Sequence, residues 1–265
     1  MIAPSPEIDL ALVEDWLKEA GEIALSKRKV LEINTKPDNT LVTNIDRQIE
    51  AFLLEKITQS YPEHQVLAEE GGVRRGNSEF LWAIDPIDGT RAFASGLPLW
   101  GISVGVLYRG DAYAGGLYLP AVGEIYLGSA DSAFHNNQPL RINKNQDIQN
   151  PMAFLAVPSN AHLFYEITFP RLRSLGSTTA HLAYVARGVA TAALTRPVRI
   201  WDIAAVVPVL SAVGIALVYL SGKPFQIHEL LDGRLSPEPI VAAPINLLDE
   251  IRGLIRVKPS QRKEE

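Results

Sequence analysis

The sequence contains no cysteine, which excludes disulfide bonds and thiolate metal sites. Histidine is scarce: the five histidines are scattered, and none follows the HxxxH or HExxH spacing of zinc sites. An excess of positive charge is absent too, because the formal net charge is −5 at pH 7 and the Arg74-Arg75 pair is short. Proteins whose main partner is a nucleic acid usually carry basic clusters, so the composition argues against that class.

The sequence predicts neither a secretion signal nor a membrane span. The first residues, MIAPSPEIDLALVEDW, have no basic segment followed by an apolar run, so no signal peptide is expected. Residues 203–220 carry no charge and have the minimum length of a spanning helix, but Pro208, Ser211 and Gly214 interrupt them. This stretch predicts a buried helix that ends near Val213, followed by a buried strand. We expect a cytoplasmic protein with no membrane partner.

The chain is long enough to bury a large core, since it has 265 residues and 47% of them are hydrophobic. Residues 1–147 predict an α+β half, in which two amphipathic helices precede strands separated by glycine-containing turns. Residues 148–258 alternate strand and helix, as an α/β layer does. Residues 259–265 form a polar tail that we expect to be disordered. The predicted fold class is α/β, with an α+β N-terminal half.

The elements expected in the first half are helices over 7–29 and 43–61 and strands over 65–70, 80–85, 101–108, 112–120 and 123–130. The second helix begins at Thr43, where Thr43 and Asp46 resemble a capping box. In the second half, strands are expected over 152–158, 171–176, 190–195, 215–220 and, as the last strand, 239–244. Helices are expected there over 177–188, 201–213 and 246–257.

Acidic residues at the ends of these elements are the unusual feature. Glu69 and Glu70 end one strand, Asp85 ends another, Asp88 lies in the turn after it, and Asp202 begins an apolar helix. Two like charges 4 Å apart repel by roughly 4 kcal/mol at an effective dielectric of 20. If these acids meet, a cation is needed among them. Without cysteine or spaced histidines, that cation is an oxygen-binding ion such as Mg²⁺ or Mn²⁺.

The stretch WAIDPIDGTRAF, residues 82–93, has the features of a binding turn. Pro86 fixes its own φ and favours an extended conformation at Asp85, which suits a strand end. Gly89 permits a sharp turn, and residues 89–93 predict a helix start whose N–H groups point at an anion. Thr90 adds a hydroxyl that can position water. Cations held by carboxylates beside such a turn indicate a site for a phosphate monoester.

This turn resembles the signature of the inositol monophosphatase family, a group of Mg²⁺-dependent, lithium-sensitive phosphatases, and WDIAA at 201–205 resembles its second signature. The blocks LVTNID (41–46), AEEG (68–71) and RSLGSTTAHLAYVARG (173–188) are also similar to family blocks, in the family's order. The resemblance covers about residues 36 to 205. It implies the layered αβαβα fold of sugar phosphatases, a small phosphorylated metabolite as substrate, inhibition by lithium, and a homodimer.

The resemblance also implies roles for single residues. Two or three Mg²⁺ ions, with Mn²⁺ as an alternative, are expected on Glu69, Asp85, Asp88, Asp202 and the carbonyl of Ile87. A metal-bound water attacks phosphorus in line, and Thr90 and Asp46 position or activate it. Gly89 and Thr90 hold the phosphate oxygens, and Asp88 and Asp202 also face the substrate. Glu70 is expected to contact the metal ligands and not the metal itself, and Lys36 is expected near the phosphate.

Structural roles are the alternative for several of these residues. Turn formation alone accounts for aspartates such as Asp85 and Asp88. Asp46 stands at N3 of a predicted helix, where an acid is favourable without catalysis. Thr90 suits any helix N-terminus. A second motif, GISVG at 101–105, fits the G-x-S-x-G nucleophile pattern, but its serine lies inside a continuous strand, so a serine hydrolase is not expected.

The substrate is the point at which the sequence departs from the family. Thr195 stands where many inositol phosphatases carry a glutamate that contacts substrate hydroxyls. The segment DGTRAFASGLPLWG is similar to members that dephosphorylate histidinol phosphate, and Arg196 and Arg199 are candidates for a different substrate wall. Three hypotheses follow: a phosphatase of polyol or sugar monoesters such as inositol monophosphate; the same chemistry on histidinol phosphate, fructose 1,6-bisphosphate or 3′-phosphoadenosine 5′-phosphate; and a non-catalytic binder of phosphometabolites. Thr90 argues against the third.

Overall fold

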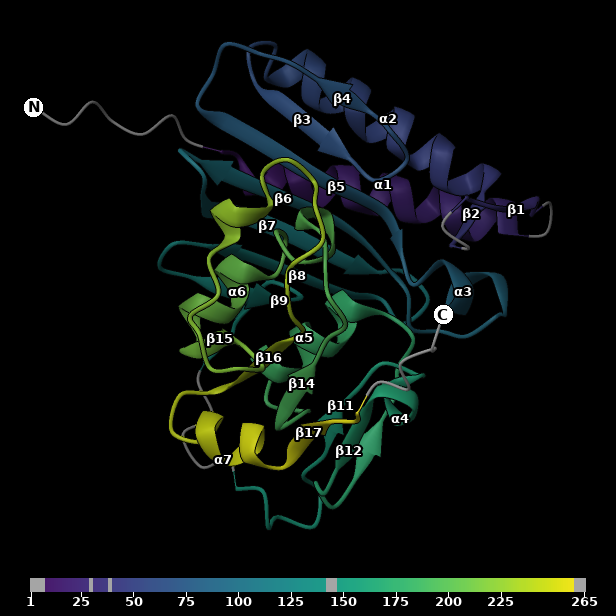
Figure 1. The fold of residues 1–265 in the computed structure, drawn as a ribbon. Helices are drawn as coiled ribbons and strands as arrows, with labels where there is room; N and C mark the ends of the chain where they lie inside the picture. The colour runs from purple at the N-terminus through teal and green to yellow at the C-terminus, as the bar shows by residue number, and fades with distance from the viewer. Residues whose placement is uncertain (1–7, 29–30, 38–39, 142–146, 260–265) are drawn as a thin grey trace, which may run out of the picture.

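The computed structural model describes residues 8–28, 31–37, 40–141 and 147–259, and these form alternating layers of helix and sheet (Figure 1). Two larger sheets bury one face each against a shared middle layer of helices. Other helices cover their outer faces. The predicted αβαβα order is therefore confirmed. Most of the tail that was expected to be disordered, residues 260–265, lies outside the described residues.

The first sheet has eight strands in the order β10-β9-β8-β7-β6-β5-β3-β4. All neighbours are antiparallel except β3 and β5, which are parallel. Its strands are β3 (Gln65–Ala68), β4 (Val73–Arg74), β5 (Phe80–Asp88), β6 (Gly101–Tyr108), β7 (Asp111–Leu119), β8 (Glu124–Ser129), β9 (Ala133–His135) and β10 (Gln138–Pro139). The strand that delivers Asp85 therefore lies between a parallel and an antiparallel neighbour.

Helices α1 (Leu10–Lys27) and α2 (Asn44–Ser60) cover the outer face of this sheet (Figure 1). Trp16 of α1 and Ile49 of α2 belong to one buried cluster with Trp82 of β5. Asp9 caps α1 by accepting the N–H of Ala11 at 2.9 Å, so the helix begins later than predicted. A short antiparallel pair, β1 (Ile33–Thr35) and β2 (Leu41–Thr43), leads into α2.

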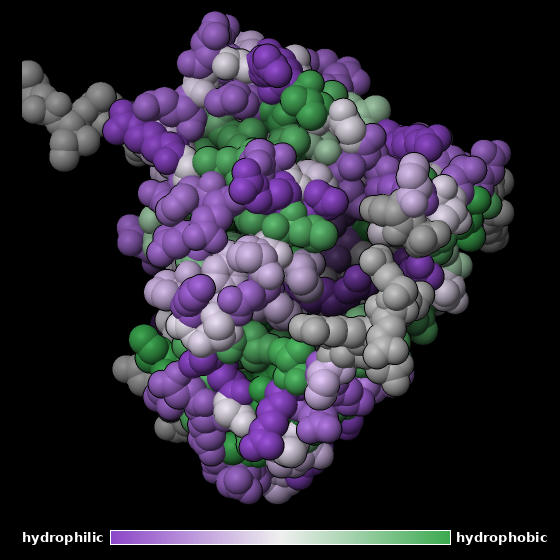
Figure 2. Space-filling model, in the orientation of Figure 1, coloured by the Kyte–Doolittle hydropathy of each residue, from purple (hydrophilic) through white to green (hydrophobic). Residues whose placement is uncertain are grey.

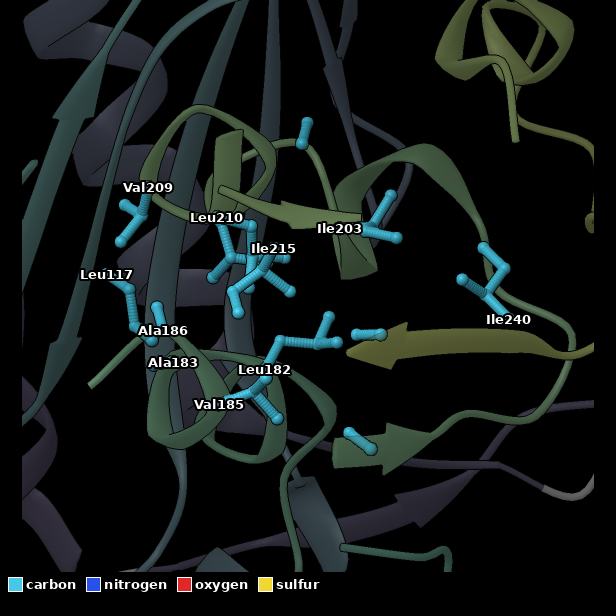
Figure 3. Packing of buried hydrophobic residues seen from close by; sticks show 14 of the residues in the cluster. Leu117, Leu182, Ala183, Val185, Ala186, Ile203, Val209, Leu210, Ile215 and Ile240 are labelled. Atoms are coloured by element: carbon cyan, nitrogen blue, oxygen red, sulfur yellow. The ribbon is translucent and has the colours of Figure 1, made fainter. Parts of the chain in front are cut away.

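The middle layer contains α5 (Thr178–Ala186) and α6 (Val207–Ala212). Figure 3 shows Leu182 of α5 and Leu210 of α6 in the cluster that also receives Leu117 from β7. The second sheet lies beyond it in the order β13-β11-β14-β16-β15. Its strands are β11 (Leu155–Ala156), β13 (Leu172–Arg173), β14 (Ala192–Leu194), β15 (Ile215–Tyr219) and β16 (Ile240–Pro244).

The helix predicted over residues 201–213 is wrong in its extent. The structure has a 3₁₀ turn, η2 (Ile200–Asp202), then an irregular stretch, and α6 begins only at Val207. Pro208 explains the break, because a proline lacks an N–H and its ring clashes with the preceding turn, so it is tolerated only in the first turn of a helix. Within the described residues, the structure has no helix of the length and apolar character that a membrane crossing requires.

The outermost layer contains α7 (Leu248–Gly253) and α4 (Ala161–Phe164), and a further 3₁₀ turn, η3 (Ile227–Leu230), precedes β16. The prediction that 239–244 is the last strand is wrong. The chain continues after α7 into β17 (Ile255–Val257), which pairs antiparallel with β12 (Tyr165–Ile167). Gly253 is a poor helix former and Ile255 and Val257 are β-branched, which favours a strand there.

Candidate active site

The strand β5 does not end at Asp85, as predicted, but continues through Pro86 and Ile87 to Asp88. Its pairing with β6 shifts register between the two aspartates, so the strand bulges there. Asp85 Oδ1 accepts the N–H of Ile87 at 3.0 Å, which is the Asx-turn contact expected of an aspartate in a turn. The bulge therefore brings two buried aspartates to the same end of one strand.

Gly89 turns the chain from β5 into the short helix α3 (Thr90–Ala94). Its φ of 89° lies in the left-handed region that favours glycine. A Cβ at this position would lie 2.6 Å from the carbonyl oxygen of Gly176, so the turn packs directly on the segment that precedes α5. Glycine is required here both by the backbone angle and by the close approach.

Three hydrogen-bond donors from the start of α5 hold the carboxylate of Asp88. Thr179 donates its N–H at 2.7 Å and its hydroxyl at 2.6 Å, and the hydroxyl of Ser177 donates as well. All three reach Oδ2. Burial raises the pKa of Asp88, and these donors oppose the rise because they stabilise the charged form. Ser177 and Thr179 were not among the predicted site residues, although the block RSLGSTTAHLAYVARG contains them.

Asp46 combines a structural and a site-facing contact. Its Oδ2 accepts the N–H of Thr43 at 2.9 Å and the hydroxyl of the same residue, which completes the predicted capping box of α2. Its Oδ1 lies 3.4 Å from Thr90 Oγ1, and that hydroxyl also lies 3.1 Å from the carbonyl of Ile87. Burial raises the pKa of Asp46 to about 6, against the opposing hydrogen bonds from Thr43.

Glu69 and Glu70 follow β3 and share one cation. Lys36 Nζ lies 2.9 Å from Glu69 Oε1 and 2.5 Å from Glu70 Oε1. Burial raises the pKa of Glu70 to about 7, and the hydrogen bond from Lys36 opposes this. Glu50 of α2 holds the loop in place, because its carboxylate accepts the N–H of Glu70 at 2.6 Å and that of Gly72 at 2.9 Å. No local pattern around Glu50 indicates this contact, which joins segments about twenty residues apart.

Asp202 is the last residue of η2, and the stretch that follows it packs closely on two glycines of the first sheet. A Cβ on Gly105 would lie 2.4 Å from the Cβ of Ala204, and one on Gly115 would lie 2.3 Å from the carbonyl oxygen of Ala205. Asp202 Oδ2 accepts the N–H of Arg199 at 2.7 Å. Burial raises the pKa of Asp202 to about 8; the Arg199 N–H opposes this, and the charges of Glu69 and Asp88 add to it.

The acids that the sequence singles out act on one another electrostatically. Burial, followed by the charges of Glu69, Asp88 and Asp202, raises the pKa of Asp85 well above its usual value. Charges that interact this strongly do not lie on separate surfaces. Among the described residues, however, no three Asp, Glu, His or Cys side chains are arranged in a group that could hold a metal ion.

Three other polar side chains, Ser103, His181 and Arg199, have hydrogen-bond partners inside the protein. Ser103 is buried inside β6 and donates its hydroxyl to the carbonyl of Trp201 at 3.3 Å, so GISVG is a packing motif and not a nucleophile elbow. His181 accepts the N–H of Leu175 at Nε2, 2.9 Å away. Arg199 Nη1 donates to the carbonyl of Gly233 at 2.5 Å, so part of its guanidinium is held by the protein itself.

A cavity of about 400 Å³ adjoins the turn at Asp88. It is lined by residues from α3, from the segments before α4 and α5, from α5 itself, and from the stretch after β14: Arg91, Pro158, Ser159, Asn160, Ser174, Gly176, Ser177, Thr178, His181, Thr195 and Arg196. Figure 2 shows one face of the molecule, which is hollowed near its centre, with hydrophilic residues in the hollow. Ser177 connects this cavity to the acids, because it belongs to the lining and donates its hydroxyl to Asp88.

Comparison with known proteins identifies the family, since its sequence model matches residues 8–243. The chain belongs to the inositol monophosphatase family. Inositol-1-monophosphatase of Bacillus subtilis is 33% identical to it over 247 residues, 87% of this chain and 93% of that protein. A histidinol-phosphatase of Chlorobaculum parvum is 29% identical over 221 residues, 79% of this chain and 84% of that protein. The structure of Thermotoga maritima IMPase matches with a TM-score of 0.81 at 24% identity, over 92% of this chain and 95% of that one.

Membership of the inositol monophosphatase family defines the reaction class. The protein is a phosphatase that hydrolyses phosphate monoesters, and the family to which it belongs is metal-dependent. This agrees with the acids described above, because buried carboxylates with raised pKa values need a neutralising partner.

Proposed function

We propose that this member of the inositol monophosphatase family hydrolyses the phosphate monoester of a small polyol or sugar, such as inositol monophosphate, with Mg²⁺ as its cofactor. The observation that carries the proposal is the buried carboxyl of Asp85, whose pKa is raised by burial and by the charges of Glu69, Asp88 and Asp202. Such a group of acids is stable in its charged form only with cations beside it.

The donor set fits Mg²⁺, because carboxylate and carbonyl oxygens are the ligands that this ion prefers. We assign Glu69, Asp85, Asp88, Asp202 and the carbonyl of Ile87 as the groups that hold two or three ions, with Mn²⁺ as an alternative. Protein donors converge on Oδ2 of Asp88, so Oδ1 is the oxygen we assign to the metal. When bound, the ions supply charge neutralisation and activation of a water for in-line attack.

Thr90 and Asp46 are the residues that we assign to positioning of the attacking water. The hydroxyl of Thr90 lies between Asp46 Oδ1 and the carbonyl of Ile87. If it donates to Asp46, its lone pairs face outward and accept a proton of the water. Gly89 and Thr90 would bind phosphate oxygens, with Asp88 and Asp202 facing the substrate from the metal side.

The proposed site draws its residues from both halves of the chain. Residues 1–147 supply most of the metal ligands, and residues 148–258 supply Asp202 and the substrate wall. That the enzyme is a cytoplasmic homodimer remains a prediction.

A phosphate-release screen tests the substrate. The protein would be assayed with Mg²⁺ on inositol 1-phosphate, histidinol phosphate, fructose 1,6-bisphosphate and 3′-phosphoadenosine 5′-phosphate, each with an EDTA control. We expect Mg²⁺-dependent release from at least one ester. The similarity to a histidinol-phosphatase makes histidinol phosphate the second candidate. No release from any of the four would contradict the proposal and favour binding without catalysis.

A further inference from the structure

The cavity beside the Asp88 turn is placed to receive the part of the substrate that does not react. Ser177, which donates to Asp88, belongs to its lining, and so does Gly176, whose carbonyl oxygen touches the Gly89 turn. An ester whose phosphate lies at Gly89 and Thr90 therefore has this cavity directly at its side. The charge of the cavity wall then helps to decide which substrates bind.

Two arginines give that wall its charge. Arg91 comes from α3 and Arg196 follows β14, and neither aspartate nor glutamate is among the described residues that line the cavity. The remaining titratable side chain in the lining is His181, whose pKa burial lowers to about 4, so it is neutral near pH 7. The wall is thus electropositive, although the chain as a whole has a net charge of −5.

Thr195 contributes no charge and no available hydroxyl to this wall. Its side chain donates to the carbonyl of Arg196 at 2.6 Å and accepts the N–H of Ile240 at 3.0 Å. The residue is buried, with 2% of its surface exposed. Both contacts are to backbone, so Thr195 fixes the start of the loop that presents Arg196. A glutamate at this position would instead add a negative charge to the cavity.

Arg196 and the neighbouring Arg199 differ in the contacts and the exposure of their guanidinium groups. Arg199 is held by the carbonyl of Gly233 and lies over the ring of Trp201, with 5.6 Å from its Cζ to the ring centroid. Arg196 is exposed and lines the cavity. An exposed guanidinium at a cavity wall suits bidentate binding of a carboxylate or a phosphate.

We propose that Arg196 binds a second anionic group of the substrate, so that this enzyme prefers phosphate monoesters that carry another phosphate or a carboxylate. The inference rests on the proposed function, because it concerns the non-reacting end of the same ester. The inference also ranks the candidate substrates. Fructose 1,6-bisphosphate and 3′-phosphoadenosine 5′-phosphate rank higher, because each carries a second phosphate. Histidinol phosphate ranks lower, because its other end carries an ammonium that the arginines repel.

Matched pairs of esters test this preference. Fructose 1,6-bisphosphate is compared with fructose 1-phosphate, and 3′-phosphoadenosine 5′-phosphate with adenosine 3′-monophosphate. For at least one pair, we expect kcat/KM to be at least about tenfold higher for the doubly charged ester, mainly through KM, and to fall with added salt. Arg196→Gln should remove that preference while leaving the singly phosphorylated ester within about twofold. Arg196→Lys should restore part of it.

Arg75→Gln is the matched control, because it removes the same charge from an exposed position outside this cavity. Calorimetric titration of each pair into Thr90→Ala with Mg²⁺ supplies a readout with little turnover and keeps the cations in the site. The same loss of discrimination is expected there when Arg196→Gln is added. Equal affinity and turnover within both pairs, or a preference that survives Arg196→Gln, would overturn the inference. Absence of turnover with every ester would count against the proposed function, while the titrations would still decide the role of Arg196.

Discussion

Lys36 Nζ lies 2.9 Å from the carboxylate of Glu69, and the same ammonium pairs with Glu70. Burial tends to lower the pKa of Lys36, but the hydrogen bond to Glu70 and the charge of Glu69 outweigh it and raise this pKa. The lysine therefore supplies a positive charge at the place where we assign a metal ligand. Lysine and metal ion stabilise the same acids, and their effects should be linked.

The substitution Lys36→Gln tests this link. In EDTA it should lower the free energy of unfolding by about 1–3 kcal/mol, because two partly buried acids lose their partner. With Mg²⁺ the loss should be smaller, since the ion stabilises the folded protein by mass action. Urea denaturation with and without Mg²⁺ measures both values. The same loss under both conditions would contradict a shared electrostatic role, and Lys18→Gln on the surface of α1 serves as control.

Asp88→Asn should abolish most phosphate release without unfolding the protein. Asparagine keeps one side-chain oxygen to accept the donors of Ser177 and Thr179, but it loses the charge that we assign to the metal. Metal activation contributes several kcal/mol to such reactions, so a loss of at least about a hundredfold in kcat is expected. Asp111→Asn, at an exposed aspartate, is the control. Substantial remaining activity in a folded variant would remove Asp88 from the metal site.

Thr90→Ala separates water positioning from metal binding. The variant loses the hydroxyl between Asp46 and the carbonyl of Ile87 but keeps every carboxylate. We expect kcat to fall by roughly 10²–10⁴, the range of general acid–base catalysis, while the Mg²⁺ dissociation constant stays within about twofold. Thr90→Ser should recover most of the rate. A wild-type rate in Thr90→Ala would show that the hydroxyl has only a structural role.

His181 makes the stability of the protein depend on pH. Burial lowers its pKa from 6.5 to about 4, so the unfolded chain takes up the proton first as the pH falls. Its contribution to stability is complete above pH 6.5 and is lost progressively between 6.5 and about 4, by about 3 kcal/mol in total. His181→Gln should remove this slope relative to the wild type, and the exposed His162→Gln should not. Urea denaturation of the metal-free proteins at pH 5 and 7.5 compares them.

Gly115→Ala tests how the stretch after η2, which contains Ala205, is held on the first sheet. The added Cβ would lie 2.3 Å from the carbonyl oxygen of Ala205, so backbone must move. Overpacking of this kind costs about 1–3 kcal/mol of stability, and activity should fall as well because Asp202 moves with η2. Gly123→Ala is no control for packing, since its φ is positive, but Gly253→Ala is, because nothing lies near its Cβ. Full activity in Gly115→Ala would show that Asp202 tolerates the shift.

The acids of the cluster could be singled out from the sequence because the residues next to them form recognisable local patterns. Asp85 and Asp88 stand at the end of an apolar strand beside Pro86 and Gly89, and each of these residue types restricts the backbone in a known way. Pro208 likewise indicates from the sequence that α6 begins close to it and not at residue 201. The strand after α7 was missed because a short apolar run is ambiguous between helix and strand until its partner is known.

Contacts between distant segments were not predictable from local pattern. Ser177 and Thr179 bind Asp88 across 89 and 91 residues, and the ion pair of Lys36 with Glu69 spans 33. Such pairs depend on how whole layers pack. The glycines of β6 and β7 are visible in the sequence, but only the structure shows that Ala204 and Ala205, which follow η2, pack on them.

The glycine contacts that hold Ala204 and Ala205, just after η2, on the first sheet have a consequence for synthesis of the chain. Asp202 is the last of the assigned metal ligands to be translated, and it arrives on a segment that docks onto strands made long before. A ribosome-bound fragment that stops short of it has the turn, the lysine and three of the acids, yet lacks the fourth. Such a fragment should have little phosphatase activity, so the enzyme becomes active only late in its own production.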